Sequence, residues 1–110
     1  MKIKTAELTG AALDWAVAKC EGEEYRDRME WDGIGQDYPA HKYSTNWAQG
    51  GPIIERGVID VISVGEMNWR GRIGASNPTS QYGPTPLIAA MRCYVASKLG
   101  DTVEIPKELI

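Results

Sequence analysis

The chain has 110 residues, of which 43% are hydrophobic and 25% are charged, a composition typical of one globular domain that spans residues 1–110. The formal net charge is −3, and no run of Lys or Arg is present, which argues against nucleic acid as a partner. No apolar run reaches the length of a membrane helix, and the N-terminal MKIKTAELTG has no apolar signal segment. We therefore expect a cytoplasmic protein with no membrane partner.

The N-terminal part of the chain predicts a strand, a turn and a helix. Residues 2–4 alternate between polar and apolar and suit a short edge strand, which a single turn over 5–8 follows. Thr9 is a good N-cap for a helix that ends near Cys20, with Gly22 as its stop. Because this helix is rich in small residues, we expect it to pack closely against another helix.

The stretch from Glu23 to Lys42 is polar, acidic and interrupted by Gly and Pro. It predicts a long exposed loop with one short strand near Trp31 and a turn at Asp32-Gly33. His41 is the only histidine, and we expect it to be solvated and not catalytic. With no second His and no CxxC pair, the sequence predicts no metal site and no cofactor.

The middle of the chain predicts a polar loop followed by strands. Tyr43–Pro52 is dense in hydrogen-bonding side chains and ends in Gly-Gly-Pro, so we expect a loop that leads into a strand over Ile53–Arg56. The β-branched run Ile59–Val64 predicts a largely buried strand, and Trp69–Ile73 its antiparallel partner. A second loop, Gly74–Gly83, follows.

The strongest helix signal is GPTPLIAAMRCYVASKLG, over residues 83–100. Thr85 suits the N-cap, Pro86 the first helical position and Gly100 the terminating residue. One side of the helix is broadly apolar, and the other carries the small residues Ala89, Cys93, Ala96 and Ser97. We expect a central helix buried between the sheet and the N-terminal helix, with the N-terminal helix against its small side.

Two helices therefore flank consecutive strands that short turns connect. After the central helix, Val103–Pro106 predicts a short extended tail. The order favours an α+β fold: a small, mostly antiparallel sheet of three to five strands with two helices packed on one face.

Three motifs point to a family. TAELTGAALDWAVAKCEG, YSTNWAQGGPIIE and GPTPLIAAMRCYVASKLGD occur in this order and together resemble the NinX-like proteins of lambdoid bacteriophages. The resemblance covers the chain except roughly residues 23–42 and the hairpin around Gly65. It implies a small phage accessory protein in the bacterial host cytoplasm, and it supplies no activity, cofactor or catalytic residue.

The motifs of common enzyme classes are absent from the chain. It has no Gly-x-Ser-x-Gly elbow, no Walker motif and no complete dinucleotide fingerprint. The acidic residues form no informative pair, and no nucleophile stands beside a base. We expect a protein that is not an enzyme.

Two aromatic and polar stretches instead predict a ligand surface, one after Tyr43 and one at the start of the central helix. The candidate ligand-binding residues are Tyr43, Asn46, Trp47, Gly51, Trp69, Arg70, Tyr82, Thr85 and Arg92. Aromatic planes, hydroxyls and Arg suit a nucleotide-like molecule. In a phage protein they favour non-enzymatic sequestration of a nucleotide-derived host immune signal. The alternative is that the polar loop residues satisfy backbone groups, that Trp47 fills the core and that Arg92 is a solvated rim residue.

A second class of function is a protein-interaction module that binds a host or phage protein. The chain has four Trp and five Tyr but no Phe, and Trp and Tyr are frequent anchors of interfaces. Small residues on helix faces also suit self-association, and a symmetric homodimer is the expected assembly.

Overall fold

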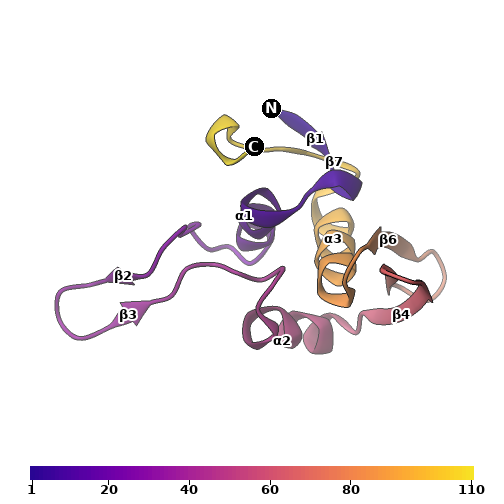
Figure 1. Cartoon of the computed structure of the whole chain (residues 1–110), viewed down its shortest axis with the longest axis horizontal. Helices are drawn as coiled ribbons and strands as arrows, with labels where there is room; N and C mark the ends of the chain where they lie inside the picture. Colours follow the sequence, from indigo (N-terminus) through magenta and orange to yellow (C-terminus); the bar gives the residue numbers. More distant parts are fainter.

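A computed structural model of the chain describes residues 1–110 (Figure 1). Its elements in chain order are β1 (Lys2–Lys4), a 3₁₀ turn (Thr5–Glu7), α1 (Gly10–Cys20), β2 (Glu30–Trp31), β3 (Asp37–Tyr38), α2 (Trp47–Gly57), β4 (Asp60–Gly65), β5 (Asn68–Ile73), β6 (Thr79–Gly83), α3 (Pro86–Leu99), β7 (Thr102–Glu104) and a second 3₁₀ turn (Lys107–Leu109). The fold is α+β, as expected, with three helices and three small antiparallel sheets. No helix has both the length and the apolar character needed to cross a bilayer.

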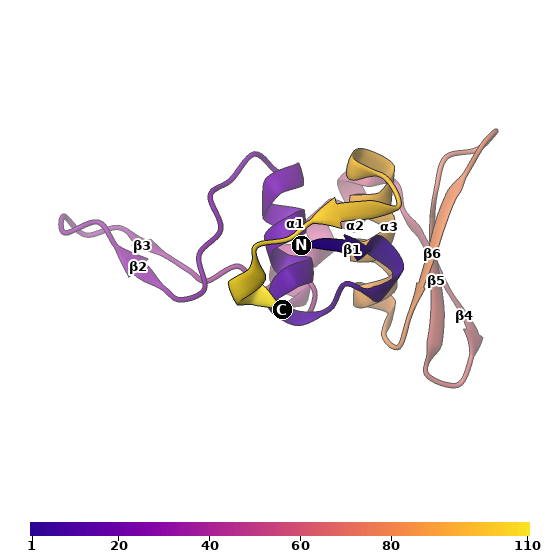
Figure 2. The same ribbon diagram turned by 90° about the horizontal axis from the view of Figure 1, so that it is seen from above.

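The helix α3 is the centre of the molecule, as the sequence predicts. The Thr85 hydroxyl accepts a hydrogen bond from the N–H of Ile88 at 3.1 Å, Pro86 occupies the first turn, and Gly100 ends the helix at φ 91°. One side of α3 contacts the sheet β4–β5–β6, and the helices α1 and α2 also pack against α3. Figure 2 shows α3 between this sheet and α1.

The small side of α3 faces the sheet, and the prediction that it faces α1 is wrong. A Cβ added to Gly71 of β5 would lie 2.8 Å from the Ala89 carbonyl oxygen, and one added to Gly83 of β6 would lie 2.8 Å from the Ala89 nitrogen. Glycines in two adjacent strands thus let the backbone of α3 approach the sheet closely. The larger side chains face the helices, where Tyr94 donates a hydrogen bond to Glu21 at the end of α1.

The strands form three separate sheets. In the order β4-β5-β6, Ile62 pairs with Arg70 and Arg70 with Tyr82. β1 pairs with β7, so the two ends of the chain lie close together (Figure 1). The expected single sheet with two helices on one face is not what forms, because the strands divide among three sheets and α1 packs mainly on α3.

The predicted strand Ile53–Arg56 is wrong, since these residues belong to α2. Asn46 caps this helix by accepting a hydrogen bond from the N–H of Ala48 at 2.9 Å. Gly-Gly-Pro usually ends a helix. Here, however, Gly50 lies against Tyr43 and Leu87, and Ile53 is buried in the core. Tertiary packing therefore outweighs the low helix propensity of this segment.

Two further predictions around the sheet are corrected. The predicted loop Gly74–Gly83 ends in β6, which pairs with β5 from Ile73↔Thr79 to Trp69↔Gly83. The strand predicted over Ile59–Val64 forms as β4, but its residues are exposed except for the half-buried Val61. β4 lies at the edge of the sheet, so its β-branched side chains meet few neighbours.

Residues 24–40, which we call the arm, leave the body between α1 and α2. They carry the antiparallel pair β2–β3, in which Glu30 pairs with Tyr38 and Trp31 with Asp37. The arm extends well away from the helices (Figures 1 and 2) and lengthens the molecule to 46 × 29 × 27 Å. The expected exposed segment with a turn at Asp32-Gly33 is confirmed, and the turn connects two strands.

Candidate functional site

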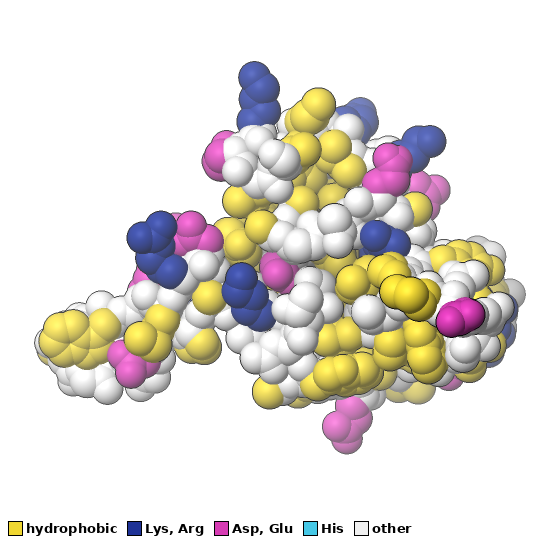
Figure 3. Space-filling view, in the orientation of Figure 1, with side chains coloured by type: hydrophobic (Ala, Val, Ile, Leu, Met, Phe, Trp, Pro, Cys, Tyr) yellow, Lys and Arg dark blue, Asp and Glu magenta, His cyan; other side chains and the backbone are white.

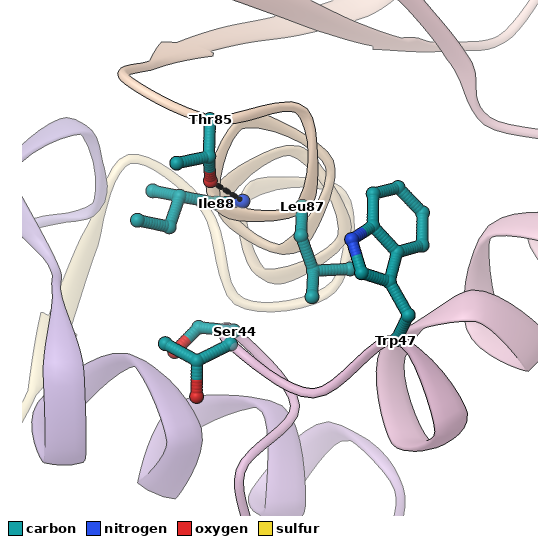
Figure 4. A pocket seen from close by; sticks show the side chains of 6 residues that line it. Ser44, Trp47, Thr85, Leu87 and Ile88 are labelled. Atoms are coloured by element: carbon teal, nitrogen blue, oxygen red, sulfur yellow. Dashed lines mark hydrogen bonds between the residues drawn. The ribbon is translucent and has the colours of Figure 1, made fainter.

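A pocket lies where the N-terminal ends of α2 and α3 meet (Figure 4). Its volume is about 190 Å³, and it is lined by Ser44, Thr45, Trp47, Thr85, Leu87 and Ile88. Trp47 and Thr85 are 38 positions apart in the sequence, and both are candidate ligand-binding residues. The structure brings these two residues together in one pocket.

Two helix caps position the walls of this pocket. Asn46 caps α2 directly before Trp47, and Thr85 caps α3 two residues before Leu87. The close approach of Gly50 to Leu87 holds the two helix ends against each other. The caps accept the N–H groups of Ala48 and Ile88, and Pro86 has no N–H, so Trp47 and Leu87 keep free backbone donors at the positive ends of the two helix dipoles.

The pocket has an apolar wall and a polar rim. Leu87 is buried, whereas the Trp47 side chain is 55% exposed and its indole lies beside Leu87 (Figure 4). The hydroxyl groups come from Ser44, Thr45 and Thr85. Such a pocket can hold a flat apolar ring against the indole while hydroxyls bind the polar edge of that ring.

Ser44 is the most buried polar residue of the pocket, with 1% exposure. Its N–H donates to the Asp14 carboxylate at 2.8 Å. Its hydroxyl lies near this carboxylate but has no partner in hydrogen-bonding geometry. Burial raises the pKa of Asp14, and the two Ser44 groups oppose this rise. A buried hydroxyl without a full hydrogen bond is costly to desolvate, so a ligand that bonds to it removes this cost.

Three predicted residues near Trp47 have structural positions outside the pocket. Tyr43 is buried, and its ring stacks on His41 with ring centroids 5.3 Å apart. Burial, the largest cause, raises the pKa of Tyr43 to about 12. Asn46 is the cap of α2, and Gly51 lies within that helix. The close backbone approach in this segment is at Gly50.

Trp69, Arg70 and Tyr82 lie in the sheet and are not brought to the pocket. Arg70 and Tyr82 are paired across β5 and β6. Since side chains alternate along a strand and Gly71 faces α3, these two side chains point to the opposite face. Trp69 points toward α3 but does not line the pocket.

Arg92 joins two parts of the body. Its guanidinium donates to the carbonyl oxygens of Leu8 and Tyr82, both at 2.8 Å. Burial lowers the pKa of Arg92. The two carbonyls therefore satisfy this half-buried guanidinium, which is not a solvated rim residue.

The prediction that His41 is solvated is wrong, because only 3% of it is exposed. Its Nδ1 accepts a hydrogen bond from the Arg26 N–H at 2.9 Å, and its Nε2 lies 2.8 Å from a Glu23 carboxylate oxygen. An accepting Nδ1 means that Nε2 carries the proton and donates to Glu23. The ring stacks between Tyr25 and Tyr43. We call these contacts of His41 the base clamp, since they hold the two ends of the arm together.

Sequence reasoning also missed Ser44, Thr45, Leu87 and Ile88 as pocket residues. Leu87 and Ile88 follow the predicted N-cap, so the start of a confirmed helix is the signal that could have found them. For Ser44 no signal exists, because its burial depends on contact with Asp14, 30 positions away.

Comparison with known proteins gives the chain a family. The family model described as "Bacteriophage P22, NinX" matches residues 4–98. A search of curated proteins found no match. The matched range includes the first two motifs that resemble the NinX-like proteins and the third as far as Lys98, together with α1, α2 and almost the whole of α3. The chain therefore belongs to the NinX family of bacteriophage proteins.

Proposed function

We propose that this protein is a phage accessory protein that acts by binding, not by catalysis, and that it holds a small flat ligand in the Trp47–Thr85 pocket. The observation that supports this most is the convergence of an exposed indole, two capped helix ends and the buried Ser44 hydroxyl on one concave surface. Aromatic planes and aimed polar groups are the usual elements of a ligand site.

The size and charge of the pocket narrow the ligand class. A pocket of about 190 Å³ is smaller than the ~300–1,000 Å³ typical for a whole ligand. It suits one ring of a larger molecule, such as the nucleobase of a nucleotide, stacked on Trp47. No Lys or Arg lines the pocket, so the helix N-termini are the groups that would attract a phosphate. Sequestration of a nucleotide-derived host immune signal is the specific function that we propose.

Isothermal titration against cyclic nucleotides and ADP-ribose derivatives tests this proposal. We expect one of them to bind, and we expect Trp47→Ala to weaken binding roughly tenfold because stacking on one base contributes about 1–3 kcal/mol. Trp31→Ala is the matched control, since Trp31 is similarly exposed at 66% but lies on the arm. A folded sample that gives no heat with any compound would sink the proposal, as would equal losses in the two variants.

The second candidate is a protein-interaction module that binds a host or phage protein. The observation that favours it is the exposure of large apolar side chains on the arm, which extends away from the helices. A stoichiometric partner that both the wild type and Trp47→Ala retain would favour this function over ligand binding. A symmetric homodimer is a separate proposal, which light scattering tests.

A further inference from the structure

The far end of the arm exposes an unusual amount of apolar surface. Trp31 is 66% exposed and Ile34 is 90% exposed, and Met29 and Tyr38 lie on the same hairpin at 63% and 42%. Figure 3 shows hydrophobic side chains gathered over this end of the molecule. We call these four side chains the tip. Scattered exposed apolar residues are ordinary, but four large ones on one short projecting hairpin indicate a binding surface.

The same segment also carries the charge of the protein. Residues 27–38 contain one Arg and four carboxylates, Asp27, Glu30, Asp32 and Asp37. Their net charge of −3 equals the formal net charge of the whole chain, so the other residues sum to zero. The tip is therefore an apolar surface surrounded by negative charge, on a body that is neutral overall.

The tip is held in a defined shape before any partner binds. One Asp32 carboxylate oxygen accepts hydrogen bonds from the N–H groups of Ile34 and Gln36, at 2.9 and 3.1 Å. Gly33 and Gly35 supply the positive φ values of 87° and 109° that this turn requires. At the other end, the base clamp joins Arg26 to His41, and the Arg26 Nε donates to the Pro39 carbonyl at 3.0 Å. A hairpin that is ordered in advance loses less entropy on binding.

We propose that the tip inserts into an apolar groove, rimmed by Lys and Arg, on a partner protein. The apolar side chains would fill the groove, and the carboxylates would pair with its cationic rim and speed the encounter. The charge disfavours other occupants, because a second tip, a nucleic acid or an anionic membrane would each place negative charge against the tip. This inference is independent of the ligand pocket, and it gives the second candidate function a specific surface and partner chemistry.

Site-specific photo-crosslinking in infected host cells tests this inference. A photoreactive residue replaces Ile34 in one protein, and Met67 in a control, because Met67 is also exposed, at 74%, but lies on the β4–β5 turn. We expect a partner adduct from position 34 only. Mass spectrometry should map the crosslink to an apolar groove of the partner that is flanked by Lys or Arg.

A charge-reversed pair separates specific docking from non-specific capture. Glu30→Lys with Asp37→Lys alters two carboxylates that make no side-chain hydrogen bond, and Glu55→Lys with Glu66→Lys is the control with the same change of net charge on exposed positions of the body. We expect the yield of the adduct to fall roughly tenfold in the variant altered on the arm, and to fall also with rising ionic strength. In the control variant the yield should persist.

Several outcomes would overturn the inference. They are an adduct with a second copy of the chain, an equal adduct from position 67, no adduct at all, and an adduct that charge reversal leaves unchanged. A partner crosslinked only from position 67 would reject the tip while supporting an interaction module with another surface. Titration of the Ile34 variant with the compounds above reports on the pocket separately, so the two proposals can fail independently.

Discussion

The body and the arm handle apolar residues in opposite ways. In the body, Ala89, Ala90, Met91 and Val95 of α3 have no exposed surface. The glycines of β5 and β6 admit the helix backbone at Ala89 and Ala90, and Met91 and Val95 belong to the apolar core. In the arm, Trp31 and Ile34 are mostly exposed, and the ordering contacts are polar ones at Asp32 and in the base clamp. Burial stabilises the body, whereas hydrogen bonds shape the arm.

This difference indicates which residues the fold needs. Buried apolar area contributes about 25 cal/mol per Å² to stability, so the close fit around α3 should dominate the free energy of unfolding. A two-stranded hairpin is marginally stable alone, and β2 and β3 contain only two residues each. The tip therefore adds little to folding, and its apolar surface remains accessible to a partner.

The largest expected loss of stability is in the body, at Gly71. A Cβ in Gly71→Ala would lie 2.8 Å from the Ala89 carbonyl oxygen and 3.0 Å from the Ala90 Cα, and backbone cannot move aside as a flexible side chain does. We expect a loss of about 3 kcal/mol in the free energy of unfolding, measured in urea. Gly65→Ala is the control, because its nearest contact is an ordinary 3.6 Å, and it should change stability by less than about 0.5 kcal/mol. Equal effects at the two glycines would contradict close packing at Gly71.

The next largest loss of stability is expected at His41, at the boundary between the body and the arm. His41→Ala removes the acceptor of the Arg26 N–H and the ring between Tyr25 and Tyr43. We expect a loss of about 1–3 kcal/mol, since a buried donor is left unpaired. Hydrogen exchange at the Arg26 amide should accelerate together with exchange in the arm, while α3 stays protected. Unchanged exchange at Arg26 would show that the base clamp does not hold the arm.

Asp14 gives a smaller effect that depends on pH. Burial raises its pKa in the folded protein, so the folded state holds this proton more tightly than the unfolded chain does. Stability should therefore fall as pH rises from the unfolded pKa of about 3.9 through the raised folded pKa. Above the folded pKa, Asp14 should cause no further change in stability. Asp14→Asn keeps an oxygen for the Ser44 N–H but has no charge to bury. Its stability relative to the wild type should increase over this window, and a constant difference in urea unfolding across pH would contradict the account.

The helix α3 could be predicted from the sequence because its signals are local. Thr85, Pro86 and Gly100 mark its ends, and the confirmed caps act within a few residues of each other. The elements that failed depend on distant contacts. α2 forms through Gly-Gly-Pro because Gly50 meets Leu87, and β6 forms because β5 lies beside it.

The residues of the candidate site also divide into those with local sequence signals and those that depend on distant contacts. Trp47 and Thr85 could be selected because an aromatic residue after a polar run and a capping Thr are visible in the sequence. Arg70 and Tyr82 were grouped with them because the sequence does not tell which face of a strand a residue occupies when both neighbours are polar or small. Ser44 and His41 are buried by partners 30 and 18 positions away, Asp14 and Glu23.

The central claim is that the tip is not needed for the fold. The most direct test is the urea unfolding of the double variant Trp31→Ser with Ile34→Ser beside the wild type. Because these side chains are 66% and 90% exposed, the free energy of unfolding should change by less than about 0.5 kcal/mol. A loss of about 2 kcal/mol or more, the size expected for a core side chain, would show that the tip packs against the body and would contradict the account.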